Sequence, residues 1–96
     1  MINIANPTKE RYVLNMYSET YYIVYPEGDI QEVPNTLTIN QLVDMNGFPL
    51  PLPLKTNKQI VYRISQISKK EYRGGCETFY YLEQLTADEL IPYVRF

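Results

Sequence analysis

The stretch Thr20-Tyr-Tyr-Ile-Val-Tyr25 decides the fold class of this chain. Every residue in it is β-branched or aromatic, which is the composition that favours a β-strand. Side chains alternate between the two faces of a strand, so both faces of this one would be apolar. A strand that is apolar on both faces is expected in the centre of a sheet.

Two further strands are expected beside this one. Residues 11–17, Arg-Tyr-Val-Leu-Asn-Met-Tyr, alternate in polarity and predict a strand that precedes it. The sequence Pro26-Glu27-Gly28 predicts a turn, because proline fixes φ and glycine tolerates the positive φ that leads into a bulge. A short strand is then expected over 30–33, ending at Pro34.

Residues 59–85 predict one long β-hairpin. Both arms carry alternating β-branched and aromatic residues, and Gly74-Gly75 between them is typical of a two-residue turn.

Two registers of this hairpin are compatible with the pattern. A tight turn at the glycines would place Ile67 opposite Leu82. A wider loop over 69–75 would place Ile64 opposite Tyr80. We prefer the wider loop, because it brings better cross-strand pairs together.

Two short helices are expected, each from a capping-box pattern. Thr38-Ile-Asn-Gln41 predicts a helix of about two turns over 39–46, with Gly47 after its C-terminus. Thr86-Ala-Asp-Glu89 repeats the pattern, and Pro92 is expected to end that helix soon afterwards. Helices this short form only when they pack against the rest of the protein.

The segment Phe48-Pro-Leu-Pro-Leu-Pro-Leu54 is expected to be extended. In a strand its three prolines would remove the amide groups of one edge, and its leucines would share the face toward the core. We therefore expect a blunted edge strand or an extended cover over the core. The alternative, a peptide ligand for SH3 or WW domains, fits less well because no P-x-x-P motif occurs.

The element order is thus β-β-β-α-extended-β-β-α. It predicts an α+β fold in a single small domain spanning 1–96, with a mainly antiparallel sheet of about five strands and two short helices. The 96 residues are too few for two domains.

Composition excludes several classes of function. The chain has no histidine and one cysteine, so histidine-based catalysis, common metal sites and an internal disulfide are excluded. No nucleotide-binding or nucleophile-elbow motif occurs, so we expect no enzyme, no catalytic residue, no cofactor and no metal. No apolar run is long enough to span a membrane and no signal peptide is evident, so we expect a cytoplasmic protein that does not enter a membrane.

Tyrosine is the unusual feature that remains. Ten of the 96 residues are tyrosine, and adjacent pairs on a strand must place one ring on each face of the sheet. Two short helices cannot cover both faces, so some rings should lie in an interface, where tyrosine is enriched. We expect a small non-enzymatic protein-interaction module, or a self-associating homo-oligomer, whose tyrosine-lined interface contains Tyr21, Tyr22, Tyr25, Tyr80 and Tyr81. Small acidic domains of this kind are often accessory proteins of bacteria, phages or mobile elements.

A nucleic-acid-binding hairpin is the alternative. The tip of the predicted hairpin is basic and carries an aromatic ring that could stack on a base; the residues concerned are Arg63, Lys69, Lys70, Tyr72 and Arg73. The chain as a whole has a net charge of −2, which is unlike a typical nucleic-acid-binding protein. A small virion or assembly subunit is a third possibility.

Overall fold

The strand over Ser18–Val24 (β1) has a partner on each side, as its composition predicts. The computed structural model describes residues 17–94, so the strand predicted over 11–17 lies outside them except for Tyr17, which is exposed. The other elements are β2 (Ile30–Val33), β3 (Leu42–Val43), β4 (Tyr62–Tyr72), β5 (Gly75–Gln84), helix α2 (Ala87–Leu90) and the 3-10 helix η1 (Ile91–Tyr93).

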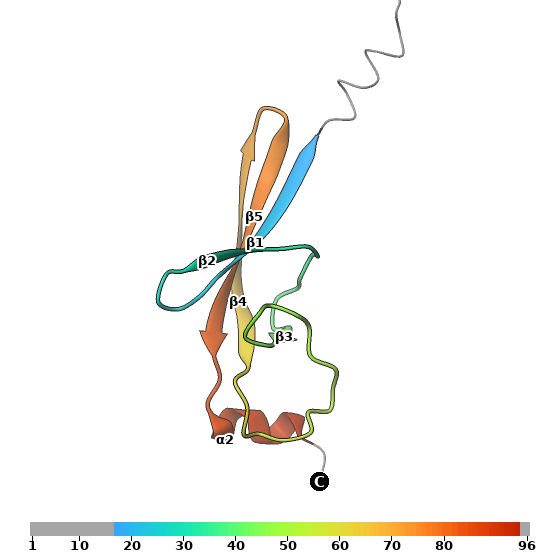
Figure 1. Cartoon of the computed structure of the whole chain (residues 1–96), viewed down its shortest axis with the longest axis vertical. Helices are drawn as coiled ribbons and strands as arrows, with labels where there is room; N and C mark the ends of the chain where they lie inside the picture. The colour runs from blue at the N-terminus through green and yellow to red at the C-terminus, as the bar shows by residue number, and fades with distance from the viewer. Residues whose placement is uncertain (1–16, 95–96) are drawn as a thin grey trace, which may run out of the picture.

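The five strands form one curled, mixed sheet in the order β2-β1-β5-β4-β3 (Figure 1). Neighbours are antiparallel except for β1 and β5, which run parallel, with Tyr22 opposite Phe79. The expectation of a mainly antiparallel sheet is therefore too simple. The hairpin returns β5 to the inside of the sheet, and β1 adds to the free edge of β5 in the same direction.

The long hairpin is confirmed, but both predicted registers are wrong: Ile67 does not lie opposite Leu82, and Ile64 does not lie opposite Tyr80. The turn is tight and consists of Arg73 and Gly74, so Tyr72 lies opposite Gly75 and Ile67 opposite Tyr80. Gly74 takes the positive φ, +92°, that the turn requires. Gly75 has another role: a Cβ there would lie 2.6 Å from the carbonyl oxygen of Ser18 and against the Tyr72 ring.

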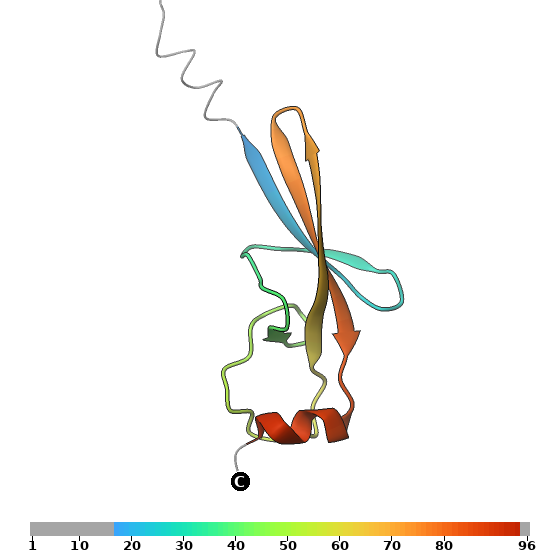
Figure 2. The same cartoon turned by 180° about the vertical axis from the view of Figure 1, so that it is seen from behind.

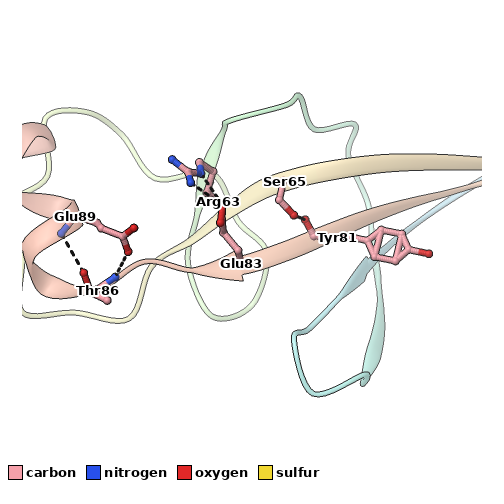
Figure 3. A network of polar contacts seen from close by, with 6 residues as sticks. All are labelled: Arg63, Ser65, Tyr81, Glu83, Thr86 and Glu89. Carbon is pink, nitrogen blue, oxygen red and sulfur yellow. Dashed lines mark hydrogen bonds and ion pairs between the residues drawn. The ribbon is translucent and has the colours of Figure 1, made fainter.

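A bulge shifts the hairpin register between Ile64 and Gln66. The extra residue, Ser65, is held by its own side chain, whose Oγ donates to the carbonyl of Tyr81 at 3.0 Å (Figure 3). Beyond the bulge, Ile64 lies opposite Leu82. The bulge thus keeps Ile64 and Ile67, which are three positions apart, on the same core face of β4.

The helix predicted over 39–46 is wrong. Asn40 has φ +68°, which ends any helix there, and β3 begins two residues later at Leu42. Half of the predicted capping box is present, because the Thr38 amide donates to Gln41 Oε1 at 2.9 Å, but it closes a turn instead. Burying Leu42 and Val43 against β4 outweighs a weak local helix preference.

The second predicted helix is confirmed as α2. Thr86 caps it with both reciprocal hydrogen bonds of a capping box, shown in Figure 3: Glu89 N–H to Thr86 Oγ1 and Thr86 N–H to Glu89 Oε1. After one turn it continues as η1, in which Pro92 occupies the first turn. The described chain therefore has one short α-helix where two were predicted.

The proline-rich segment is not an edge strand. Within it only Pro49 and Leu54 make isolated bridges, to Val43 and Val94. Leu50 and Leu54 pack on the core, whereas Leu52 is 58% exposed, so the leucines do not share one face. The expected cover over the core is thus provided by two leucines of an irregular segment.

The core has two parts, and Figures 1 and 2 show the elements around them. The first lies on one face of the sheet, under the segment that follows β2; it contains Ile23, Val33, Leu37, Val43, Ile64, Tyr80 and Leu82. The second lies between the ends of β4 and β5 and α2; it contains Leu42, Leu54, Val61, Leu85 and Leu90. The adjacent residues Leu42 and Val43 of β3 join the two parts.

Candidate functional site

The two faces of the sheet differ in what covers them. On the core face, Ile23, Tyr80 and Leu82 are at most 5% exposed. On the opposite face the side chains remain partly or largely exposed, although they are apolar. We call this second surface the aromatic face; it consists of Tyr22, Val24, Ile30, Phe79 and Tyr81.

Three neighbouring strands build the aromatic face through their register. Parallel pairing of β1 with β5 sets Tyr22 opposite Phe79, and their rings stack with centroids 5.2 Å apart. Two residues further along, Val24 lies between Tyr81 on β5 and Ile30 on β2. Ile30 is 58% exposed, so the surface ends in a large aliphatic side chain at the sheet edge.

Acidic side chains border the aromatic face. Glu32 lies opposite Tyr22 on β2, and Glu77 lies two residues before Phe79 on the same face of β5. Desolvation by neighbouring side chains raises the pKa of Tyr22, and the charges of Glu77 and Glu32 raise it further. The Tyr22 hydroxyl therefore remains a neutral donor and acceptor at physiological pH.

An ion pair lies on the same side of the hairpin, nearer α2. Arg63 donates to Glu83 Oε1 from Nε at 3.1 Å and from Nη2 at 2.6 Å, as Figure 3 shows. The hydrogen bonds to Glu83 raise the pKa of Arg63. Both side chains keep part of their surface in water, so screening limits what this pair adds to stability.

The other predicted interface tyrosines lie on the core face. Tyr80 is 3% exposed and stacks with Tyr21 at 6.4 Å, while the Tyr21 hydroxyl donates to Glu19 at 2.7 Å. That hydrogen bond is the main reason why the pKa of Tyr21 is raised. Tyr25 donates to the carbonyl of Met45 at 2.6 Å. Each adjacent tyrosine pair thus divides between the faces, which leaves Tyr22 and Tyr81 on the aromatic face.

Sequence reasoning missed three members of the aromatic face: Val24, Ile30 and Phe79. The sequence could have indicated Val24, because it lies two residues after Tyr22 and residues at that spacing share one face of a strand. Phe79 precedes Tyr81 at the same spacing. The place of Ile30 follows only from its position opposite Val24 in the sheet.

The residues of the predicted nucleic-acid site do not form one patch. Lys69 and Lys70 are neighbours on β4 and therefore point to opposite faces of the sheet. Arg63 lies ten positions from Arg73, about 30 Å along a strand, and is paired with Glu83. Tyr72 packs over Gly75. Binding of nucleic acid remains an untested prediction.

A groove of about 380 Å³ opens on the core face beyond Leu37, lined by β1, β4 and β5. Its lining includes the free thiol of Cys76. Residues 17–94 contain no group of three side chains suited to holding a metal ion. Within the same residues no helix has the length and apolar character needed to cross a membrane.

Comparison with known proteins places this chain in one family. No curated protein and no solved structure matches it significantly. A family model described as "Uncharacterised Treponema protein" matches residues 17–93, which is nearly the whole part of the chain described above. The match includes every strand of the sheet and both short helices. The chain therefore belongs to this family.

Proposed function

We propose that this protein is a non-enzymatic protein-interaction or self-associating module that uses the aromatic face of its sheet. The supporting observation is the contrast between the two faces. The core face buries Ile23, Tyr80 and Leu82 almost completely, whereas the aromatic face leaves a contiguous set of rings and aliphatic side chains accessible to a partner.

The chemistry of the aromatic face suits binding to protein. Tyrosine and phenylalanine supply large contact areas at a low cost in side-chain entropy, and tyrosine hydroxyls can bond to backbone groups of a partner. The stacked rings of Tyr22 and Phe79 are already fixed by the sheet, so little order has to be gained on binding. The bordering acids Glu32 and Glu77 favour a partner surface with basic residues at its rim.

A pull-down from cells of the native host tests the proposal. The baits are the wild-type chain, a Tyr22→Ser/Tyr81→Ser variant, and a Tyr17→Ser control that removes an exposed tyrosine outside the aromatic face. We expect the same protein to be captured by the wild type and the control but not by the double variant. Far-UV circular dichroism establishes that all three baits are folded.

Two outcomes would contradict the proposal. One is equal capture of that protein by the double variant. The other is capture that disappears after nuclease treatment, which would favour the nucleic-acid alternative instead. In that case binding should also weaken steeply as salt is raised.

A further inference from the structure

Among residues 17–94, no strand pairs with the outer edge of β4 over most of its length. β3 pairs only with Tyr62 and Arg63. The next residue, Ile64, bonds to the turn that precedes β3: its carbonyl accepts from Asn40 N–H, and its N–H donates to the Gln41 carbonyl. From Ser65 to Tyr72, no strand of residues 17–94 lies on that side. Figure 1 shows the hairpin extending well beyond β3.

The backbone groups that face this open edge can be identified from the turn. In a two-residue hairpin the closing pair, here Tyr72 and Gly75, is hydrogen-bonded. Alternation then directs the N–H and C=O groups of Glu71, Lys69 and Ile67 away from β5. The bonds that Ile64 makes on the same outer side, beyond the bulge, agree with this pattern.

The side chains of these three residues share one face. They lie opposite Cys76, Thr78 and Tyr80, on the core face of the sheet, and line its groove. Lys69 and Glu71 are both exposed and have opposite charges. The open edge thus offers a cation and an anion two residues apart, each beside free backbone groups.

This arrangement is complementary to itself. If a second copy of β4 runs antiparallel to the first and the two-fold axis passes through Lys70, Lys69 of each copy lies opposite Glu71 of the other. We propose that two copies of this chain associate in this way, as a closed dimer with a continuous sheet across the two β4 strands. The two Lys69–Glu71 pairs and the backbone bonds of the same residues hold the copies together.

Charge selects this register over its neighbour. A shift by two residues would place Lys69 directly opposite Lys69 of the second copy, which is unfavourable. A shift by one residue would place core-face side chains opposite those of the other face. In the proposed register Lys70 lies opposite Lys70 of the second copy on the aromatic side, and the two Lys69–Glu71 pairs outweigh that one repulsion.

The ends of this edge limit strand addition at β4 to one further copy. The turn at Arg73 and Gly74 closes one end, and the turn that binds Ile64 closes the other. Each copy uses its single open stretch of β4, so the contact is isologous and complete in a dimer. Edge lysines usually prevent strand addition. Here Lys69 has an acidic counterpart in the same strand and instead specifies the partner.

The inference deepens the self-association part of the proposed function and needs no residue of the aromatic face. It is tested by sedimentation equilibrium on the full chain. Lys69→Glu and Glu71→Lys should each weaken the dimer roughly tenfold or more, because each turns both attractive pairs into repulsive ones. An equimolar mixture of the two variants should recover a dimer, since the two acidic side chains of one variant then lie opposite the two lysines of the other.

Two further variants make the result specific. Lys69→Glu/Glu71→Lys should dimerise like the wild type, and Lys58→Glu, the same charge change at an exposed residue outside β4, should have no effect. Recovery in the mixture also shows that each variant was folded. A wild-type chain that stays monomeric at about 1 mM would overturn the proposal.

A dimer whose dissociation constant is unchanged by Lys69→Glu and by Glu71→Lys would also overturn the proposal. If Tyr22→Ser/Tyr81→Ser alone disrupts that dimer, the copies associate through the aromatic face. The edge proposal would then fail while the proposed function would stand.

Discussion

Gly47 occupies a position where any side chain would enter the core. Its φ is +87°, and a Cβ there would lie 2.8 Å from Ile23 Cδ1 and 3.0 Å from Val33 Cγ1. Gly28 also has a positive φ, +103°, but its Cβ would meet nothing within 4 Å. Substituting Gly28 therefore tests backbone strain alone, whereas substituting Gly47 tests strain together with crowding in the core.

Gly28→Ala should lower the free energy of unfolding by about 1–2 kcal/mol, because alanine disfavours positive φ. Gly47→Ala should cost a further 1–3 kcal/mol or so, because the methyl group also displaces Ile23 in a closely packed core. Urea denaturation of both variants measures the difference. Equal losses would mean that the core around Ile23 yields freely to an added methyl group.

Glu89 makes the stability of α2 depend on pH. Its carboxylate accepts from the Thr86 backbone at 2.8 Å, and this bond is the main reason why its pKa lies below the usual value of 4.5. A carboxyl whose pKa is lowered by folding stabilises the protein above its unfolded pKa. That stabilisation is lost as the pH falls through the folded pKa.

Glu89→Gln keeps an oxygen acceptor for the Thr86 amide but removes the charge. At pH 7 the variant should melt at a lower temperature than the wild type. The difference should shrink below about pH 4.5 and vanish once Glu89 is protonated in both the folded and the unfolded chain. Melting curves between pH 2 and 7 test this, and a constant difference across that range would show that the charge is not involved.

At the scale of the elements, the local sequence predicted a strand, turn or helix correctly where neighbouring residues together favour one backbone geometry. The β-branched and aromatic run of β1, the Pro-Glu-Gly turn before β2 and the capping box of α2 were all predictable for that reason. The segment over 39–46 failed because its helical pattern competes with burial in the sheet. Asn40 tolerates a positive φ, and Leu42 and Val43 gain more by joining the two parts of the core.

The candidate site was predictable only in part, for a related physical reason. Alternation along a strand showed that Tyr21 and Tyr22 must face opposite ways, and so must Tyr80 and Tyr81. Which face is covered depends on where Leu37 and the rest of the irregular segment pack. It also depends on the parallel pairing of β1 with β5, between residues more than fifty positions apart. No local pattern encodes either contact.

At the scale of the whole molecule, the two parts of the core should unfold together. β4 and β5 run between them, and Leu42 and Val43 are adjacent residues that belong one to each part. The second part is closed by α2 through Leu90, which is fully buried, and by the bond from Leu54 N–H to the Tyr93 carbonyl at 2.7 Å.

Leu90→Ala should therefore lower the free energy of unfolding by about 2–5 kcal/mol and should do so for both parts of the core. Native-state hydrogen exchange measures this at the Leu54 and Leu85 amides of the second part and the Ile64 amide of the first, each of which is bonded to another backbone carbonyl. All three should lose protection equally, because the strands that connect them open as one unit. Ile91→Ala, at the neighbouring and 44% exposed position, should change protection by less than about 0.5 kcal/mol. If Leu54 and Leu85 exchange faster while Ile64 keeps its protection, the end of the molecule that carries α2 opens independently of the sheet.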